Sequence, residues 1–196
     1  MTDTAPTRCR WVSDDPLYQT YHDEEWGRPD TDSRSLFEKL CLEGQQAGLS
    51  WITVLRKREN YRALFAGFDP QQIVQFDDER ITAIAANPGI IRHRLKVEAI
   101  VRNARAYLAM EARGVSFADF LWQFVQGKTR VHRRQGLNDV PSQSPEAEQM
   151  SKQLKKAGFT FVGPTICYAF MQAVGMVNDH QLDCHVYKAC VAEAKK

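Results

Sequence analysis

The interpretation of the fold starts from the stretch Gly158-Phe159-Thr160-Phe161-Val162-Gly163-Pro164-Thr165. It separates two segments that we predict as helices, one from Ser144-Pro145 to Gly158 and one from about Pro164 to Val174. Glycine favours the end of a helix and proline its first position, so the stretch predicts a hairpin between two helices. Free backbone N–H groups at the start of the second helix would suit a DNA phosphate. A plain helix–helix turn explains the same residues equally well.

Helical signals continue outward from this hairpin. Capping residues predict further helix starts at Asp15-Pro16, Asp32-Ser33, Ser50, Asp69-Pro70, Asp77-Asp78 and Ser116. We expect the first of these helices to end at about Glu25, the second near Gly48, and the one capped by Ser50 to run through to Phe65. A long amphipathic helix is predicted after the turn Asn87-Pro88-Gly89, because apolar residues recur there at helical spacing. Residues 126–145 predict a long loop, and no segment alternates with period two, so the predicted fold class is all-α.

Length and composition favour one globular domain spanning residues 1–196. The net charge of +2 does not exclude DNA as a partner, because a basic face can coexist with a nearly neutral total. No apolar run approaches the ~18 residues of a membrane span. The segment Met1–Arg10 lacks the apolar core of a secretory signal. We therefore expect a cytoplasmic protein with no membrane partner, and a monomer is the default assembly.

Two pairs of metal-ligand residues lie near the two ends of the chain. Cys9 and His22 are close to the N-terminus, and His180 and Cys184 are close to the C-terminus. One helical turn would place His180 and Cys184 on the same face. Two cysteines and two histidines form a closed tetrahedral zinc site, which is structural rather than catalytic. The alternative is that the cysteines are core residues and the histidines lie on the surface.

The other cysteines fit less specific roles. The chain has five cysteines, an odd number, and a reducing compartment makes a disulfide framework unexpected. Cys41 and Cys167 have apolar neighbours and are expected to be small buried hydrophobic residues. His185 and Cys190 are alternative metal ligands, because spacing alone does not exclude them.

Aromatic residues and one acidic residue predict a binding pocket. Trp11, Tyr18, Tyr21 and Trp26 crowd the first helical segment, and Glu43 falls on the apolar side of the next. A carboxyl group there must be paired, hydrogen-bonded or functional. Flat aromatic walls with one carboxylate suit a planar, electron-poor base, because stacking gives affinity and the acid reads amino hydrogens or positive charge. A packed core with a paired carboxylate is the alternative.

Basic residues occur in several clusters. They comprise Arg56-Lys57-Arg58, Arg92-His93-Arg94-Leu95-Lys96, the segment Lys128 to Arg134, and Lys152, Lys155 and Lys156. Together these clusters could neutralise a phosphate backbone. Each one taken singly is typical of a solvated face.

Several motifs together identify a family resemblance that covers most of the chain from Cys9 to about Cys184. The motifs are Cys9-Arg10-Trp11, Tyr21-His22-Asp23-Glu24-Glu25-Trp26-Gly27, Leu42-Glu43-Gly44-Gln45-Gln46-Ala47-Gly48-Leu49-Ser50-Trp51, Gly89-Ile90-Ile91-Arg92-His93-Arg94, Phe161-Val162-Gly163-Pro164-Thr165 and Val177-Asn178-Asp179-His180. With these motifs the chain closely resembles the DNA-3-methyladenine glycosylase I family of base-excision repair enzymes. The resemblance implies a helix-hairpin-helix glycosylase fold, with the hairpin at Phe161 to Thr165.

The resemblance also implies roles for individual residues. A structural Zn²⁺ would be held by Cys9, His22, His180 and Cys184, so the zinc-binding ends lie at about 9–22 and 180–184. The base pocket would use Glu43 and Tyr21 as catalytic residues, Trp51 and Tyr18 around the base, and Trp11 and Trp26 as supporting walls. DNA contacts would come from Gly163 and Thr165 of the hairpin and from the loop Gln45 to Leu49. That loop would fill the gap left in the duplex, with Gln46 and Gly48 as DNA-binding residues and Leu49 as the apolar wedge.

The implied reaction is hydrolytic release of N3-methyladenine from alkylated double-stranded DNA after the nucleotide is flipped out, leaving an abasic site and free 3-methyladenine. Other helix-hairpin-helix glycosylases carry a catalytic aspartate after the hairpin, and Asp183 falls near that place. Asp183 is interpreted first as a bystander or as a group beside the metal ligand, and second as a catalytic acid. The alternative functions are a zinc-stapled module that binds lesions without cleavage and a glycosylase with a broader set of alkylated purines.

Overall fold

The computed structural model describes residues 6–194, and helices dominate this part of the chain. The α-helices are α1 (Pro16–Glu24), α2 (Ser33–Gln46), α3 (Trp51–Leu55), α4 (Arg58–Leu64), α5 (Pro70–Ile73), α6 (Asp78–Ala86), α7 (Arg94–Glu111), α8 (Phe117–Trp122), α9 (Pro145–Lys156), α10 (Pro164–Ala173) and α11 (Tyr187–Glu193). Short 3-10 helices occur at Ala66–Phe68, Gln123–Val125 and Leu137–Asp139. Between residues 6 and 194, no helix combines the length and apolar character that crossing a membrane requires.

Side-chain caps explain where most helices begin. The carboxylates of Asp15, Asp32, Asp69 and Asp77 accept backbone N–H bonds in the first turns of α1, α2, α5 and α6. Such caps satisfy N–H groups that have no partner within the helix. The starts predicted at these residues, and at Ser116 and Ser144, are therefore confirmed.

The helix predicted from Ser50 to Phe65 is wrong as a single element. The chain breaks between α3 and α4, and the Ser50 hydroxyl bonds to Thr53 Oγ1 at 2.8 Å instead of capping a backbone N–H. The three basic residues at the break bind three different parts of the fold: Arg56 pairs with Asp15, Lys57 donates to Pro88 O, and Arg58 pairs with Glu25. These tertiary contacts outweigh local helical preference.

A small strand pair corrects the prediction that no sheet is present. β1 (Arg130–Val131) and β2 (Val177–Asn178) pair in parallel, with Arg130 opposite Val177 and Val131 opposite Asn178. β1 lies inside the segment predicted as a loop. Two residues are too few to display the alternation that marks a strand in sequence. The pairing fixes the long loop after α8 beside the segment that follows α10.

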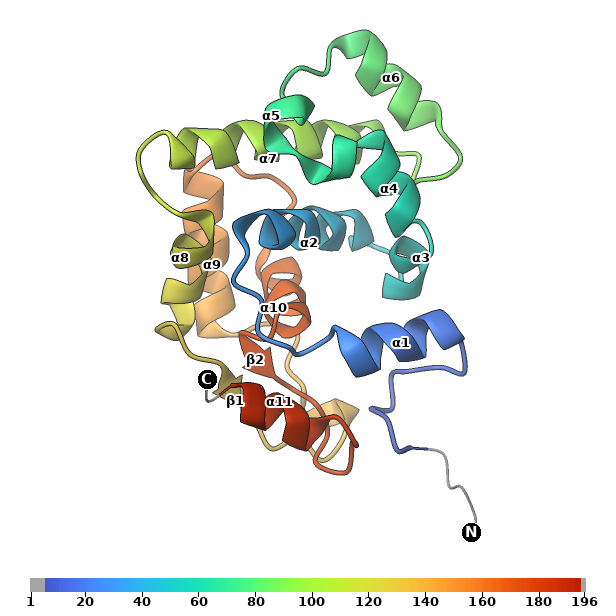
Figure 1. The fold of residues 1–196 in the computed structure, drawn as a ribbon, viewed down its shortest axis with the longest axis vertical. Coiled ribbons are helices and arrows are strands. Elements are labelled where there is room, and N and C mark those ends of the chain that lie inside the picture. The colour runs from blue at the N-terminus through green and yellow to red at the C-terminus, as the bar shows by residue number, and fades with distance from the viewer. Residues whose placement is uncertain (1–5, 195–196) are drawn as a thin grey trace.

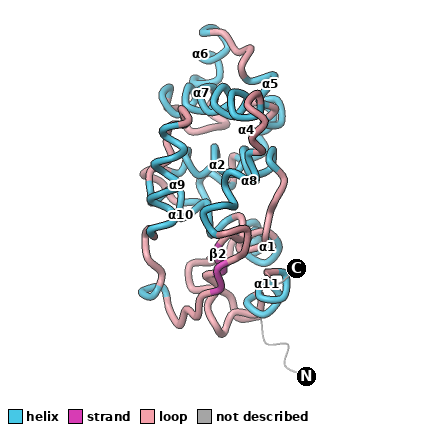
Figure 2. Tube along the Cα trace, turned by 90° about the vertical axis from the view of Figure 1, so that its left-hand side faces the viewer, coloured by secondary structure: helices cyan, strands magenta, loops and turns pink. Residues whose placement is uncertain are grey.

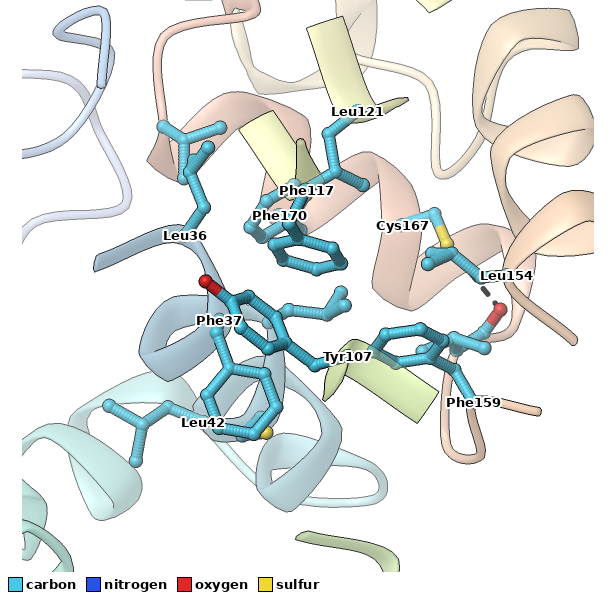
Figure 3. Packing of buried hydrophobic residues seen from close by; sticks show 14 of the residues in the cluster. Leu36, Phe37, Leu42, Tyr107, Phe117, Leu121, Leu154, Phe159, Cys167 and Phe170 are labelled. Atoms are coloured by element: carbon cyan, nitrogen blue, oxygen red, sulfur yellow. Dashed lines mark hydrogen bonds between the residues drawn. The ribbon is translucent and has the colours of Figure 1, made fainter. Parts of the chain in front are cut away.

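Helix α2 lies at the centre of the molecule. It packs against α3, α7, α8 and α10, and Figure 1 shows it between α7 on one side and α10 on the other. Helices α4 to α7 form one end, whereas α1, α11 and the strand pair lie at the opposite end in both views (Figures 1 and 2). The main core lies around α2, α7, α8 and α10, where Phe37, Tyr107, Phe117 and Phe170 point toward one another (Figure 3).

The connection between α9 and α10 packs directly on α2. Asn103 of α7 holds it, because its Oδ1 accepts from Thr160 N at 2.8 Å and its Nδ2 donates to Thr160 O at 3.2 Å. A Cβ added at Gly44 of α2 would lie 3.1 Å from Phe161 O. Gly44 therefore allows the helix and the turn to approach closely.

Gly175 allows a second close approach, and its replacement tests how the α1–α2 connection is held. Gly175 has φ +70, and an added Cβ would lie 2.3 Å from the backbone carbon of Arg28. We expect Gly175→Ala to lower the free energy of unfolding by about 3–5 kcal/mol, since positive-φ strain and overpacking add together. Urea denaturation measures the loss.

The matched control is Gly114→Ala. Gly114 also has positive φ, at +76, but nothing lies within 4 Å of an added Cβ. Its replacement is expected to cost only ~1–2 kcal/mol. Equal losses at the two glycines would contradict the close approach at Gly175.

Candidate active site

One cavity of about 210 Å³ collects the aromatic residues and the acid predicted for the base pocket. Its volume is below the ~300–1,000 Å³ of sites for drug-sized ligands and suits one flat heterocycle. The predicted pocket residues that line it are Trp11, Tyr18, Tyr21, Trp26, Glu43 and Trp51, together with Gln46 from the predicted DNA-binding loop. The remaining lining residues include Leu137, Val140, Gln172 and Asp179.

The aromatic walls of this cavity pack in edge-to-face and tilted pairs. The ring of Trp11 lies 4.9 Å from that of Tyr18 and 5.1 Å from that of Trp26, measured between centroids. Tyr21 lies 5.5 Å from Trp51, with the two rings tilted by 44°. Burial, and then the charge of Glu43, raise the pKa of the Tyr21 hydroxyl well above its ordinary value. Tyr21 therefore faces the cavity as a neutral phenol.

Glu43 is a buried carboxyl group without a complete set of partners. The residue is 3% exposed, and its Oε2 is one of two buried side-chain atoms within residues 6–194 that make no hydrogen bond. The other is Trp51 Nε1, which also belongs to a residue lining the cavity. Burial raises the pKa of Glu43 to about 8. Buried unpaired polar atoms are costly, so an acceptor and a donor left open in one cavity indicate a ligand-binding site.

Asp179 lines the same cavity and was missed as a candidate residue by the sequence analysis. Its Oδ1 accepts from His132 Nδ1 at 2.6 Å and from Arg134 Nε at 2.7 Å. Its Oδ2 accepts from Tyr168 at 2.6 Å and from Gln172 at 3.0 Å. Burial opposes its ionisation, but these bonds outweigh burial and hold the pKa of Asp179 below its ordinary value. The available signal was the motif Asn178-Asp179-His180, to which no role was attached for its aspartate.

Asp183, in contrast, does not reach the cavity. Its side chain is exposed, and it is not among the residues that line the cavity. This position gives it no contact with a base bound among the aromatic residues. The buried carboxylate that faces the cavity from this part of the chain is Asp179.

The four predicted metal ligands form one buried cluster. One ligand atom each from Cys9, His22, His180 and Cys184 lies within 4.8 Å of the others, so the group could hold a metal ion. Both imidazoles are oriented by their second nitrogen: His22 Nδ1 contacts Asp23 Oδ1 at 2.7 Å, and His180 Nε2 contacts Trp26 O at 3.0 Å. Such outer partners are typical of metal-ligating histidines.

The backbone conformation that brings His180 and Cys184 together differs from the helical turn that the sequence predicted. The segment between them is a turn rather than a helix, closed by a bond from Cys184 N to Gln181 O at 2.9 Å. The competing ligands lie outside the cluster. His185 Nδ1 contacts Thr7 O at 2.9 Å, and Cys190 packs in the same apolar cluster as Cys9 and Cys184 without belonging to the ligand group.

The residues predicted to contact DNA lie at the C-terminal end of α2 and at the start of α10, and the first two residues of the predicted loop Gln45 to Leu49 still belong to α2. Gly48 and Leu49 follow the end of α2, and Leu49 is 41% exposed. Gly163 is the N-cap of α10, whose first turn carries the exposed Thr165, and no side chain caps this end. Several residues of the basic clusters are already paired, among them Arg56, Arg58 and Arg94.

A mostly helical protein with an aromatic cavity and an open buried carboxyl fits the DNA glycosylases, and comparison with known proteins supports this class. The family model described as methyladenine glycosylase matches residues 11–187. The chain therefore belongs to the methyladenine glycosylase family, and it is a DNA glycosylase.

Individual relatives agree with the family. The chain is 56% identical over 180 residues to DNA-3-methyladenine glycosylase 1 of Escherichia coli (strain K12), covering 92% of this chain and 96% of the relative. A solved structure of 3-methyladenine DNA glycosylase I superposes with a TM-score of 0.91 at 59% identity, covering 91% of this chain and 98% of the other. A structure of the Staphylococcus aureus enzyme, described for its recognition of 3-methyladenine, gives a TM-score of 0.87 at 40% identity over 93% and 97% of the chains.

Proposed function

We propose that this glycosylase flips N3-methyladenine out of alkylated double-stranded DNA and hydrolyses its glycosidic bond, leaving an abasic site and free 3-methyladenine. The observation that carries the proposal is the open carboxyl of Glu43 inside an aromatic cavity sized for one heterocycle. A base in a stacked duplex is out of reach of any such cavity, so extrusion at a cost of a few kcal/mol must come first.

Recognition follows from the chemistry of the cavity walls. Trp51 and Tyr18 sandwich the base, Tyr21 adds a polar contact, and Trp11 and Trp26 support the walls. Methylation at N3 gives the adenine ring a positive charge, which aromatic faces attract. Glu43 accepts hydrogen bonds from the adenine edge, and the cationic ring favours the ionised form of its carboxyl.

The same positive charge simplifies the chemical step. The base leaves as a neutral molecule when the bond between N9 and the sugar breaks, so no strong general acid is required. The sugar takes on oxocarbenium character, water attacks it, and the water loses a proton. The work of the protein is then selection of the base and electrostatic stabilisation of the sugar cation. Normal adenine is rejected because it lacks the positive ring and its bond to the sugar is far stronger.

DNA engagement is assigned to the two exposed turns. In this proposal α9, the turn and α10 form a helix-hairpin-helix unit, in which free N–H groups near Gly163 and Thr165 bind a backbone phosphate. The turn after α2 fills the gap left by the flipped base, with Leu49 as the wedge between neighbouring bases and Gln46 and Gly48 beside it.

We further propose that the buried cluster holds a structural Zn²⁺. Ligand bonds of ~2.3 Å to sulfur and ~2.05 Å to nitrogen place neighbouring S and N atoms about 3.6 Å apart in a tetrahedron. Three S–N separations in the cluster match this value: Cys9 Sγ to His180 Nδ1 at 3.4 Å, Cys184 Sγ to His22 Nε2 at 3.5 Å, and Cys184 Sγ to His180 Nδ1 at 3.6 Å. The Cys9 thiol, followed by the imidazoles of His180 and His22, lowers the pKa of Cys184, which favours a thiolate ligand.

Zinc would supply cross-linking rather than chemistry, because a set of four protein ligands leaves no open position. We also propose that residues 1–196 form one glycosylase domain that acts as a monomer in the cytoplasm.

Base release from methylated DNA tests this function directly. Duplex DNA treated with a methylating agent is incubated with the purified protein, and the released purines are separated by chromatography. We expect free 3-methyladenine as the product. Release of 7-methylguanine as well would mean that the enzyme accepts a broader set of alkylated purines. No release by a folded, zinc-loaded protein that still binds methylated DNA would replace the proposal with a lesion-binding module.

A further inference from the structure

Lys96 is a buried cation that neither the cavity nor the metal cluster uses. It lies in the first turn of α7 and is 6% exposed. Its Nζ donates to Gln45 O at 2.8 Å and to Ala47 O at 2.7 Å. Burial lowers the pKa of Lys96. Burying a lysine costs free energy unless its ammonium group is well hydrogen-bonded. The two bonds to the end of α2 therefore indicate a role for Lys96 at that position.

The two carbonyl groups belong to the C-terminal end of α2. The last carbonyls of a helix have no partners within the helix. A cation stabilises this end, because the helix dipole is negative there. The last turn of α2 contains no basic residue, so α7 supplies the cation from outside. Lys96 therefore caps α2 at the point where the chain leaves the helix.

A second set of hydrogen bonds fixes the end of α2 against Lys96. Gln45 Nε2 donates to the backbone oxygen of Lys96 at 3.0 Å. Tyr61 of α4 donates its hydroxyl to Gln45 Oε1 at 3.0 Å and accepts from Ile91 N at 3.1 Å. The end of α2 is thus held from α7, from α4 and from the turn before α7.

Few interactions hold the turn 47–50, which follows the end of α2. Ala47 has left the helical region, with φ −45 and ψ 114, and Gly48 has φ +79 with nothing within 4 Å of an added Cβ. Leu49 N bonds to Gln46 O at 2.6 Å, but its side chain is largely in solvent at 41% exposure. The two bonds from Lys96 therefore hold the backbone from which the turn carrying Leu49 begins.

We propose that Lys96 is a positioning residue for base extrusion: by holding Gln45 O and Ala47 O, it fixes the turn 47–50 so that Leu49 enters the duplex at the gap. This inference rests on the proposed function of Leu49 as the wedge. It assigns to Lys96 no contact with the base or the sugar. Loss of Lys96 should therefore impair action on duplex DNA and leave the base cavity intact.

The test compares two readouts in Lys96→Met, Leu49→Ala and the double variant. We expect Lys96→Met to lower kcat/KM for base release from methylated duplex DNA by about 10-fold to 100-fold, since a misplaced group of this kind costs that much. Its Kd for free 3-methyladenine, followed by tryptophan fluorescence, should stay within about twofold of the unaltered protein. Leu49→Ala should give the same pattern. The double variant should lose no more than the larger single loss, because both changes remove one effect.

Two further variants complete the design. Lys39→Met is the matched control, because Lys39 pairs with Asp30 at 2.8 Å rather than with the end of α2, and it should change neither readout. Lys96→Gln keeps a donor without the charge, and it serves as the folded variant if Lys96→Met does not fold by circular dichroism.

Three results would overturn the inference. They are an unchanged rate on duplex DNA in the Lys96 variants, a parallel loss of affinity for the free base, and additive losses in the double variant. Failure of the unaltered protein to release any base would instead refute the proposed function itself, so the two failures are distinguishable.

Discussion

Replacing Glu43 with glutamine is expected to remove most base release and, at the same time, to stabilise the fold. Glutamine is nearly isosteric but carries no charge that could favour the cationic base. We expect kcat/KM for 3-methyladenine release to fall by about 10²–10³-fold, the usual loss when one electrostatic contact to the transition state is removed. Binding to methylated duplex DNA should persist, because phosphate contacts supply much of that affinity.

The pH dependence of the unaltered enzyme follows from the raised pKa of Glu43, which is about 8. The ionised carboxylate is the form that favours the cationic base, so kcat/KM should rise about tenfold per pH unit below pH 8 and level off above it. In Glu43→Gln this rise should be absent. A variant that keeps both its rate and its pH profile would show that another group is responsible.

The stability change has the opposite sign to the activity change. The pKa of this carboxyl is at its ordinary value of 4.5 in the unfolded chain but about 8 in the folded protein. Above pH 4.5 the unfolded state therefore gains stability, and the free energy of unfolding falls until about pH 8. At pH 7 the difference amounts to about 3 kcal/mol, which Glu43→Gln recovers.

Thermal unfolding at several pH values measures this difference. Glu38→Gln is the matched control, because Glu38 lies on the same helix but pairs with Arg62 and does not line the base cavity. It should gain no stability at pH 7. A stability gain in Glu43→Gln that did not grow from pH 5 to pH 8 would contradict the raised pKa.

Cys184→Ser is expected to produce the largest loss of stability in the molecule. Apparent binding free energies of structural zinc are ~10–16 kcal/mol in small domains, and that energy is folding energy. We expect one zinc per chain by elemental analysis, and its loss in Cys184→Ser with a fall in Tm of at least about 10 °C. Treatment with a strong chelator should lower Tm in the same way.

Cys190→Ser is the control for this experiment. Cys190 is equally buried but lies outside the ligand cluster. Its replacement should keep the zinc and cost only ~1–3 kcal/mol for a buried hydroxyl. Full stability of Cys184→Ser, or equal losses in both variants, would refute a structural metal at this site.

The parts of the fold that the sequence predicted depend on neighbours close in the chain. Caps such as Asp15 and Ser144 act within three residues, so their patterns announce the start of α1 and α9. The break between α3 and α4 depends on contacts with Asp15, Glu25 and Pro88, which lie ~30–40 residues away, as the separations of the bonded pairs show. The helix propensity of neighbouring residues gives no information about such distant partners.

The residues of the candidate site likewise fall into those that the sequence predicted and those that depend on distant contacts. The aromatic residues and Glu43 stood out because their residue types are unusual at their positions, and all of them line one cavity. Asp179 did not stand out, because its importance comes from His132, Arg134 and Tyr168, which reach it from other segments. Lys96 resembled one more member of a basic cluster until its bonds to the end of α2 were visible.

The cluster of Cys9, His22, His180 and Cys184 also sets an order of events during synthesis. A ribosome delivers Cys9 and His22 first, and His180 follows Cys9 by 171 residues. Trp26, which lines the base cavity, bonds through its backbone oxygen to His180, and Asp179 directly precedes that histidine. The nascent chain therefore cannot complete its base cavity before Asp179 and His180 emerge. We expect a chain that ends before Asp179 to release no base, because it lacks this lining residue of the cavity and two of the four metal ligands.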